Sequence, residues 1–283
     1  MSTFTASMFE SIKGALTKNN ENVSSKIKDY LKTEVGNTYV VRLLPNVKDP
    51  TKTFFHYYSY GWNSVTTGQL VTTVSPTTWN QRDPIAEERY RILRNGTEKE
   101  KEKALAIKRR ENWLVNVYVV NDPVNADNNG KIKIVRFGRQ LHKIIMDAIE
   151  GEEAAELGPR IFDLSSKGCN LRIKVEKQGD YPTYVSSKFS TPKEIEGLDE
   201  DSYDKIYKSA FDLESYVSVK SYDELKDLLD THYNGTKDVE EVEAPTTSAP
   251  VPAAKVSVKE TKTEVKKVSQ DDDESISELL KDL

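Results

Sequence analysis

The composition of the chain changes after Gly235, and this break confines any folded core to the residues that precede it. Residues 236–283 contain no aromatic residue, and Glu, Val, Thr, Pro, Ala and Lys dominate residues 236–270. A segment of this composition buries too little apolar surface to offset the entropy lost on ordering. The 283-residue chain is therefore expected to hold one elaborated core domain over residues 21–235 and a disordered linker over residues 236–270.

The acidic excess of the chain lies in the same tail. The formal net charge is -5, and residues 236–283 hold 7 Lys against 12 Asp or Glu, so the body is neutral in sum. Within the body, residues 89–110 carry nine cations and three acids, and residues 131–143 carry five cations and no acid. This concentration favours a local polyanion-binding surface without a basic isoelectric point. Two solvated helix faces would produce the same pattern.

Both ends of the chain carry apolar residues at helical spacing. Met8, Ile12 and Leu16 predict a short helix in an N-terminal arm over residues 1–20, which could dock on the body or on a neighbouring copy. Residues 271–283 form an acidic tip that we expect to fold as an amphipathic helix against a partner. The residues assigned to partner binding are Asp271, Asp272, Asp273, Glu274, Ile276, Leu279, Leu280 and Leu283.

Local patterns predict a mixed α+β core. Strands are expected over residues 39–44, 54–60, 69–74, 113–120, 132–137 and 170–176. Helices are expected over residues 84–110, with a break at Gly96 and Thr97 as the N-cap of the second part, and over residues 141–149, 204–211 and 222–233. No strand-helix-strand rhythm repeats, which favours an OB-fold-like, five-stranded, partly open β-barrel with inserted helices over a doubly wound sheet.

Several protein classes do not fit this sequence. No apolar run approaches the roughly 18 residues of a membrane helix, and the first residues do not resemble a secretory signal, so we expect a cytoplasmic protein. The single cysteine, Cys169, and three scattered histidines match no common zinc-ligand spacing. The phosphate-loop, dinucleotide, nucleophile-elbow and zinc-protease motifs are absent. We therefore expect no enzyme activity and no cofactor.

Cations and aromatic residues occur together at three places in the body. Lys108, Arg109 and Arg110 run into Trp113, and residues 131–137 alternate cations with Phe137. Tyr181 and Tyr184 are expected in a loop that precedes Lys188. Single-stranded nucleic acid needs this pairing, because bases stack on aromatic rings and phosphates bind cations. Each aromatic could instead be a core residue. The predicted DNA-binding residues are Lys108, Arg109, Arg110, Trp113, Tyr90, Arg91, Lys131, Lys133, Arg136, Phe137, Arg139, Tyr181, Tyr184 and Lys188.

The sequence resembles the single-stranded DNA-binding, helix-destabilising proteins of T-even-like bacteriophages. The similarity covers most of residues 35–190 and the last thirteen residues, in the same order. The residues that carry it include the runs Ile107 to Arg110, Val41-Arg42-Leu43-Leu44-Pro45, Gly130-Lys131, Arg136-Phe137-Gly138, Ser187-Lys188-Phe189 and Leu279 to Leu283, together with Trp113, Asn116, Asp122-Pro123, Tyr181 and Tyr184.

The resemblance implies an OB-fold whose cleft holds single-stranded DNA during phage replication, recombination and repair in the host-cell cytoplasm. It also implies self-association along DNA through the N-terminal arm. The acidic tail would recruit replication and recombination proteins such as a polymerase, a helicase loader and a recombinase mediator, without membrane contact.

Three departures from the family pattern stand out. Residues 60–90 contain neither Cys nor His, where T-even-type members hold a structural zinc, so we expect apolar contacts around Trp62, Trp79 and Ile85 in its place. The basic N-terminal cluster of the family is not visible. Val135, Thr97 and Ala104 stand at aromatic positions of the family, which implies fewer stacked bases.

Three other functions remain open from the residues alone. An RNA-binding OB protein, such as a translational regulator, would use the same cations and rings. A replication adaptor would bind proteins through its tail and no nucleic acid through its body. A metal-dependent nuclease could be built from dispersed carboxylates, which the sequence does not distinguish from surface acids.

Overall fold

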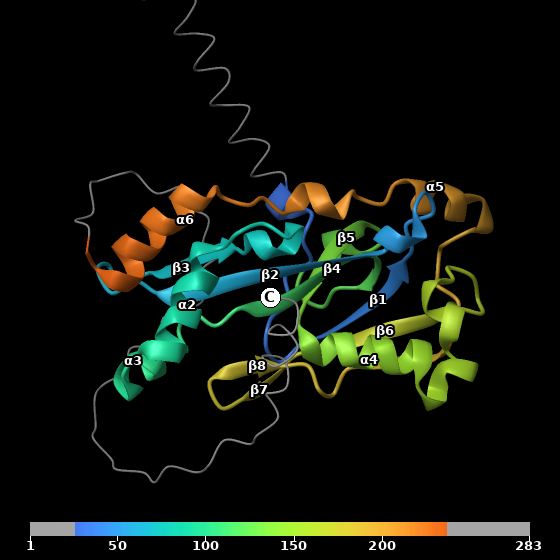
Figure 1. Cartoon of the computed structure of the whole chain (residues 1–283). Helices are drawn as coiled ribbons and strands as arrows, with labels where there is room; N and C mark the ends of the chain where they lie inside the picture. The colour runs from blue at the N-terminus through green and yellow to red at the C-terminus, as the bar shows by residue number, and fades with distance from the viewer. Residues whose placement is uncertain (1–25, 237–283) are drawn as a thin grey trace, which may run out of the picture. The chain divides into compact units, whose positions relative to one another are not determined.

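The computed structural model describes residues 26–236 (Figure 1). The predicted N-terminal arm at residues 1–20, the linker at 236–270, of which only residue 236 is described, and the acidic tip at 271–283 therefore lie outside the described residues. The described part is an α+β fold built on a mostly antiparallel sheet, which confirms the predicted fold class at that level.

The helices and strands follow one another in short segments. The strands are β1 (Thr38–Leu44), β2 (Phe54–Asn63), β3 (Leu70–Val74), β4 (Arg110–Asn121), β5 (Ile132–Phe137), β6 (Cys169–Lys174), β7 (Glu176–Gln178), β8 (Tyr181–Thr183) and β9 (Lys188–Pro192). The helices are α2 (Pro84–Asn95), α3 (Glu98–Lys103), α4 (Arg139–Glu150), α5 (Tyr203–Lys208) and α6 (Tyr222–Leu229).

One seven-stranded sheet organises these elements around β4. Its order is β3-β2-β4-β1-β6-β9, with β5 on β4 as well, and β7 and β8 form a separate hairpin. β4 pairs with β2 through its first half and with β1 through its second half. β5 pairs with residues 113–118 in the middle of β4. A strand has only two edges, so β1 and β2 share one of them and β5 occupies the other.

The sheet is buried on both faces along β4. Val115, Val117 and Val119 belong to the main core cluster, which α4 covers with Leu141 and Ile145. On the opposite face, Leu114 and Tyr118 pack in two smaller clusters, one of them with residues 211–217. Burial on two sides explains why this strand is almost continuously apolar in sequence and was predictable.

A second core cluster holds the region of residues 60–90, where apolar contacts were expected in place of a zinc site. Trp62 and Ile85 are buried there, as expected, together with residues of α2 and α6 and with Ala104 and Ile107, which follow α3. Trp79 lies outside this cluster, beside Phe55. The Asp83 carboxylate supplies a polar centre: it accepts hydrogen bonds from Tyr60 Oη at 2.8 Å, from Ser75 and from the first backbone amides of α2.

The predicted helix over residues 84–110 is too long. The break at Gly96 and the Thr97 cap are confirmed, and Thr97 forms a capping box with Glu100. The second helix, however, ends at Lys103 rather than at Arg110. Ala104 and Ile107 turn into the second core cluster, and the chain then pairs with β2. Burial of these two side chains, followed by strand pairing from Arg110 onward, therefore overrides the local helical preference.

The segment around Tyr181, expected as a loop, is part of a hairpin. Tyr181 to Thr183 forms β8 against β7, and β9 follows along β6. The sheet thus has seven strands where five were predicted in a barrel. These short strands contain Pro182 and Pro192 and few apolar residues, so no alternation of apolar and polar side chains marks them.

The Arg42 side chain joins four separate segments inside the protein. It is fully buried, and its Nε donates to Asn170 Oδ1 on β6 at 2.9 Å. Its two terminal nitrogens donate to the carbonyls of Asp163, Ser165 and Lys193, the last at 2.9 Å. Burial lowers the pKa of Arg42 from its ordinary value. The planar fork of donors satisfies acceptors that apolar neighbours would leave unpaired.

We predict that Arg42→Met lowers the free energy of unfolding by about 3 to 5 kcal/mol, because the buried Asn170 Oδ1 and three partly buried carbonyls lose their donor. Urea denaturation followed by circular dichroism measures this loss. Arg160→Met is the matched control: Arg160 is exposed in the segment before β6, and its replacement should change stability by about 0.5 kcal/mol or less. Equal effects of the two substitutions would contradict the role assigned to Arg42.

Candidate nucleic-acid interface

Arg109 and Arg110 point to opposite faces of the sheet at the start of β4. The Arg109 guanidinium lies over the ring of Tyr58, 3.9 Å from its centroid. Nη2 of Arg110 instead donates to the Gly61 carbonyl at 3.2 Å. Lys108 is exposed on the turn before the strand. The three adjacent cations of the sequence are thus divided by the alternation of side chains along a strand.

Four aromatic rings form a continuous row beside Arg109, which we call the aromatic row. Tyr58 contacts His56 edge to face at 4.7 Å between centroids, and His56 stacks on Trp113 at 4.8 Å. Trp113 also stacks on His142 at 4.1 Å. The pairing of His56 with Trp113 across β2 and β4 fixes the row, and α4 supplies His142.

Trp113 occupies the boundary between this row and the core. Its side chain is half-buried and also packs on Phe137, at 6.1 Å between ring centroids. Phe137 is only 5% exposed and belongs to the main core cluster with Val135. Contrary to expectation, Phe137 is therefore not a surface aromatic, although it lies on the same strand face as Lys133.

Glu111 offsets part of the positive charge around the aromatic row. Its carboxylate bonds Nε of Arg139 at 2.6 Å and lies 3.9 Å from Nε2 of His56. Burial lowers the pKa of His56, against the opposing effect of Glu111. Arg109 bonds Thr77 Oγ1 at 2.9 Å and has no carboxylate partner among residues 26–236. Arg109 is thus the cation beside the row whose charge is uncompensated.

Arg89 adds a second positive group near Arg109. It is half-buried on α2, and its Nε is buried without a hydrogen-bond partner in the described residues. Burial lowers the pKa of Arg89, and the positive charge of Arg109 lowers it further. A buried donor without an acceptor is costly in a folded protein.

The β7-β8 hairpin lies against the start of α4, the helix that carries Arg139 and His142. The backbone amide of Tyr184 donates to Gln140 Oε1 at 2.9 Å, and its hydroxyl lies 3.3 Å from Thr33 Oγ1. Tyr184 is half-buried against the main core, whereas Tyr181 is 78% exposed. Of the two predicted tyrosines, Tyr181 therefore offers the free ring.

The predicted residues of α2 are largely engaged with their own helix. Tyr90 is 39% exposed, and the Arg94 guanidinium lies 5.2 Å from its ring centroid. Arg91 forms an ion pair with Glu88 at 2.7 Å. These side chains lie at the surface, but each already has an intramolecular partner.

The cations of β5 do not gather in one place. Lys133 donates to the Lys28 carbonyl at 2.7 Å, and Lys131 is exposed just before the strand. Arg136 lies on the opposite face, where burial raises the pKa of Tyr57 and a hydrogen bond from Arg136 opposes that rise. The sequence-predicted cluster on this strand is thus divided between two faces.

Sequence reasoning missed three rings of the aromatic row, namely His56, Tyr58 and His142. A signal for the first two was present, because residues 54–60 alternate aromatic side chains on both faces of a strand. His142 carried no signal, since its stacking depends on how α4 packs over the sheet. No group of His, Cys, Asp or Glu among the described residues could hold a metal ion. In that same part of the chain, no helix is long and apolar enough to cross a membrane.

Comparison with known proteins places the chain in a family of DNA-binding proteins. The family described as "gp32 DNA binding protein like" matches residues 34–233. The chain is 25% identical over 216 residues to the single-stranded DNA-binding protein of Enterobacteria phage T4, covering 73% of this chain and 70% of that protein. It is 30% identical over 125 residues to the single-stranded DNA-binding protein of Enterobacteria phage T2, covering 42% and 41%. The chain belongs to the gp32-like DNA-binding protein family.

Proposed function

We propose that this protein binds single-stranded DNA without sequence preference and coats it during phage DNA replication, recombination and repair. Single strands expose base faces and phosphates together, and a site built from rings and cations contacts both. Neither feature distinguishes one base from another, so binding is expected to be sequence-tolerant. Coating would remove secondary structure in the strand by mass action.

The observation that carries this proposal is the aromatic row with the uncompensated Arg109 at its end. β2, β4 and α4 contribute four rings that lie within stacking distance of one another. The Arg109 guanidinium covers the ring of Tyr58 at the end of the row. Arg89 lies beside it with an unsatisfied buried donor. The names of the phage T4 and T2 relatives support the same ligand.

We assign the predicted residues unequal roles in this site. Arg109 and Lys108 would contact phosphates beside the row, and Trp113 would hold the rings in place rather than present a free face, because His56 and His142 cover it. Tyr181 would stack a base at the β7-β8 hairpin. Arg110 and Arg136 lie on the other sheet face and would contribute through their charge alone.

The remaining parts of the proposal concern architecture and partners. The antiparallel sheet centred on β4 is compatible with an OB-fold, with residues 29–31 hydrogen-bonded along the free edge of β5. Residues 1–20 would mediate contact between neighbouring copies on DNA. Residues 271–283 would bind replication and recombination proteins. No cofactor and no enzyme activity are part of this proposal.

Arg109→Ala should weaken binding to oligo(dT) about tenfold, the loss expected for one charge-assisted contact. Arg110→Ala, which removes the same charge from the opposite sheet face, should have a clearly smaller effect. Quenching of intrinsic tryptophan and tyrosine fluorescence measures the affinity, with a duplex and oligo(U) as competitors. Absence of quenching by oligo(dT) would refute single-strand binding, and preference for oligo(U) would favour an RNA ligand.

Binding to oligo(dT) should strengthen as the pH falls from about 7.5 to about 5.5, across the ordinary pKa of histidine. Burial lowers the pKa of His56 in the free protein, so the ring is neutral at the higher pH. Nearby phosphates would favour its protonated form, and binding would then take up a proton. His56→Gln should flatten the pH dependence. An unchanged slope in this variant would remove His56 from the site.

Deletion of residues 271–283 should tighten binding to oligo(dT) at low salt and have little effect at high salt. The acidic tip, attached through a linker of about 35 residues, would have an appreciable effective concentration near the cationic surface and would compete with phosphates. Titrations of the full chain and the shortened chain at two salt concentrations test this. Equal affinities at low salt would argue against competition.

A further inference from the structure

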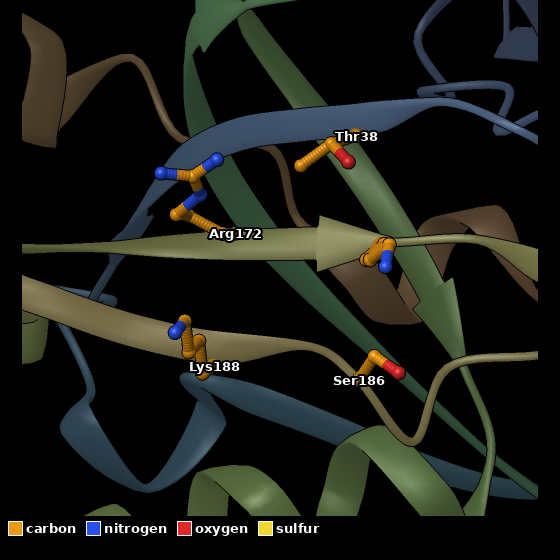
Figure 2. A pocket seen from close by; sticks show the side chains of 5 residues that line it. Thr38, Arg172, Ser186 and Lys188 are labelled. Carbon is orange, nitrogen blue, oxygen red and sulfur yellow. The ribbon is translucent and has the colours of Figure 1, made fainter.

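A second cluster of cations lies on the outer face of β6 and β9, away from the aromatic row. It borders a hollow of about 440 Å³, which we call the β6-β9 hollow. The hollow is lined by Thr38, Arg172, Lys174, Ser186 and Lys188, and the side chains of its labelled residues project from neighbouring strands and from the turn before β9 (Figure 2). Of these residues, only Lys188 belongs to the set predicted from sequence.

Arg172 and Lys188 are directly opposite each other in the paired strands. Both side chains are exposed, and neither has a hydrogen bond or ion pair among residues 26–236. Two like charges at directly paired positions destabilise a sheet. An anion bound between the two groups would offset this repulsion.

The remaining lining groups favour an anion rather than a cation. Lys174 pairs with Glu176 at 2.7 Å, and Ser186 donates to the same carboxylate, so one acid is already neutralised inside the cluster. These two hydrogen bonds lower the pKa of Glu176. Two positive charges are left in excess, beside the hydroxyl of Thr38 as a further donor.

A neighbouring hollow of about 600 Å³ shares Arg172 but has a different character. Its lining includes Glu194 and Glu196 as well as Lys193, so its charges nearly cancel. Of these two hollows, the β6-β9 hollow is thus the one with an excess of positive charge.

The β7-β8 hairpin adjoins both the β6-β9 hollow and the helix that contributes His142 to the aromatic row. Lys174 and Lys188 lie just before and just after this hairpin in the chain. Its other contact is with Gln140 on α4, the helix that contributes His142 to the row. A DNA single strand that leaves the aromatic row and stacks on the exposed ring of Tyr181 would therefore reach Arg172 and Lys188 next.

We propose that Arg172 and Lys188 form a phosphate-binding site for single-stranded DNA that extends the strand path from the aromatic row across the β7-β8 hairpin. This inference rests on the proposed function. The ligand is the phosphodiester backbone, and Thr38 donates a hydrogen bond to it while Lys174 stays paired with Glu176. A short oligonucleotide held by the row alone does not reach this site, whereas a longer one does.

The test uses the full-length double variant Arg172→Ala/Lys188→Ala and two oligo(dT) lengths, roughly 5 and roughly 15 nucleotides, within the span of known OB-fold site sizes. Neither substitution removes a fluorescent residue, so intrinsic quenching reports binding in both proteins. For the longer strand we expect about tenfold weaker binding and a slope of log K against log salt that is shallower by about 1.4, two phosphate contacts at about 0.7 each. The shorter strand should bind with unchanged affinity.

The control is Lys220→Ala/Lys226→Ala, which removes the same charge from exposed positions at α6. This control variant should leave the difference in affinity between the short and the long oligo(dT) unchanged. The Arg172→Ala/Lys188→Ala variant should unfold at the same temperature as the wild type or a higher one, because a like-charge pair is lost. A lower unfolding temperature would contradict this reading of the pair.

Three results would overturn the inference. An unchanged salt slope on the longer strand would remove the pair from the DNA path. Equal losses of affinity for the short and the long oligo(dT) would place Arg172 and Lys188 within the site at the aromatic row. A variant that binds DNA normally but no longer responds to deletion of residues 271–283 would identify the acidic tip as the occupant. Failure of the wild type to bind either strand would refute the proposed function itself, which keeps the two failures distinct.

Discussion

The buried Arg42 guanidinium is the interaction on which the arrangement of the sheet depends. It hydrogen-bonds Asn170 on β6, the carbonyls of Asp163 and Ser165 before that strand, and Lys193 after β9. A buried cation tolerates no missing acceptor, so these segments must assemble together around β1. The close fit extends to Gly168, where a Cβ atom would collide with both the Asp163 carbonyl and the guanidinium. The same assembly places Arg172 and Lys188 opposite each other.

The long strand β4 connects this framework to the candidate interface. Its second half pairs with β1, and its first half pairs with β2 and carries Trp113 into the aromatic row. Because side chains alternate along a strand, the same geometry sends Arg109 to the row and Arg110 to the far face. Both faces of β4 are buried, which limits how far the row can move. The interface is therefore attached to the most constrained strand of the protein.

Local sequence patterns predicted many of the strands and helices, but not where each of them ends. The strand at residues 132–137 and the Thr97 N-cap are found where the patterns placed them, because each is determined by neighbouring residues. The helix expected to reach Arg110 ends at Lys103, because Ala104 and Ile107 are buried in the second core cluster and the chain pairs with β2 from Arg110 onward. Tyr181 lies in a strand rather than a loop, since three-residue strands leave no periodic signal.

The sequence alone determined that rings and cations occur together, that the acidic excess lies after Gly235 and which family the chain resembles. Composition and motif order are properties of the chain itself, so no folding is needed to read them. Only the tertiary structure decided which of those side chains meet. It buried Phe137, divided Arg109 from Arg110 and brought His142 onto Trp113, because contacts between distant segments are set by strand register and helix packing. The opposition of Arg172 and Lys188 is likewise a consequence of register, which local sequence does not encode.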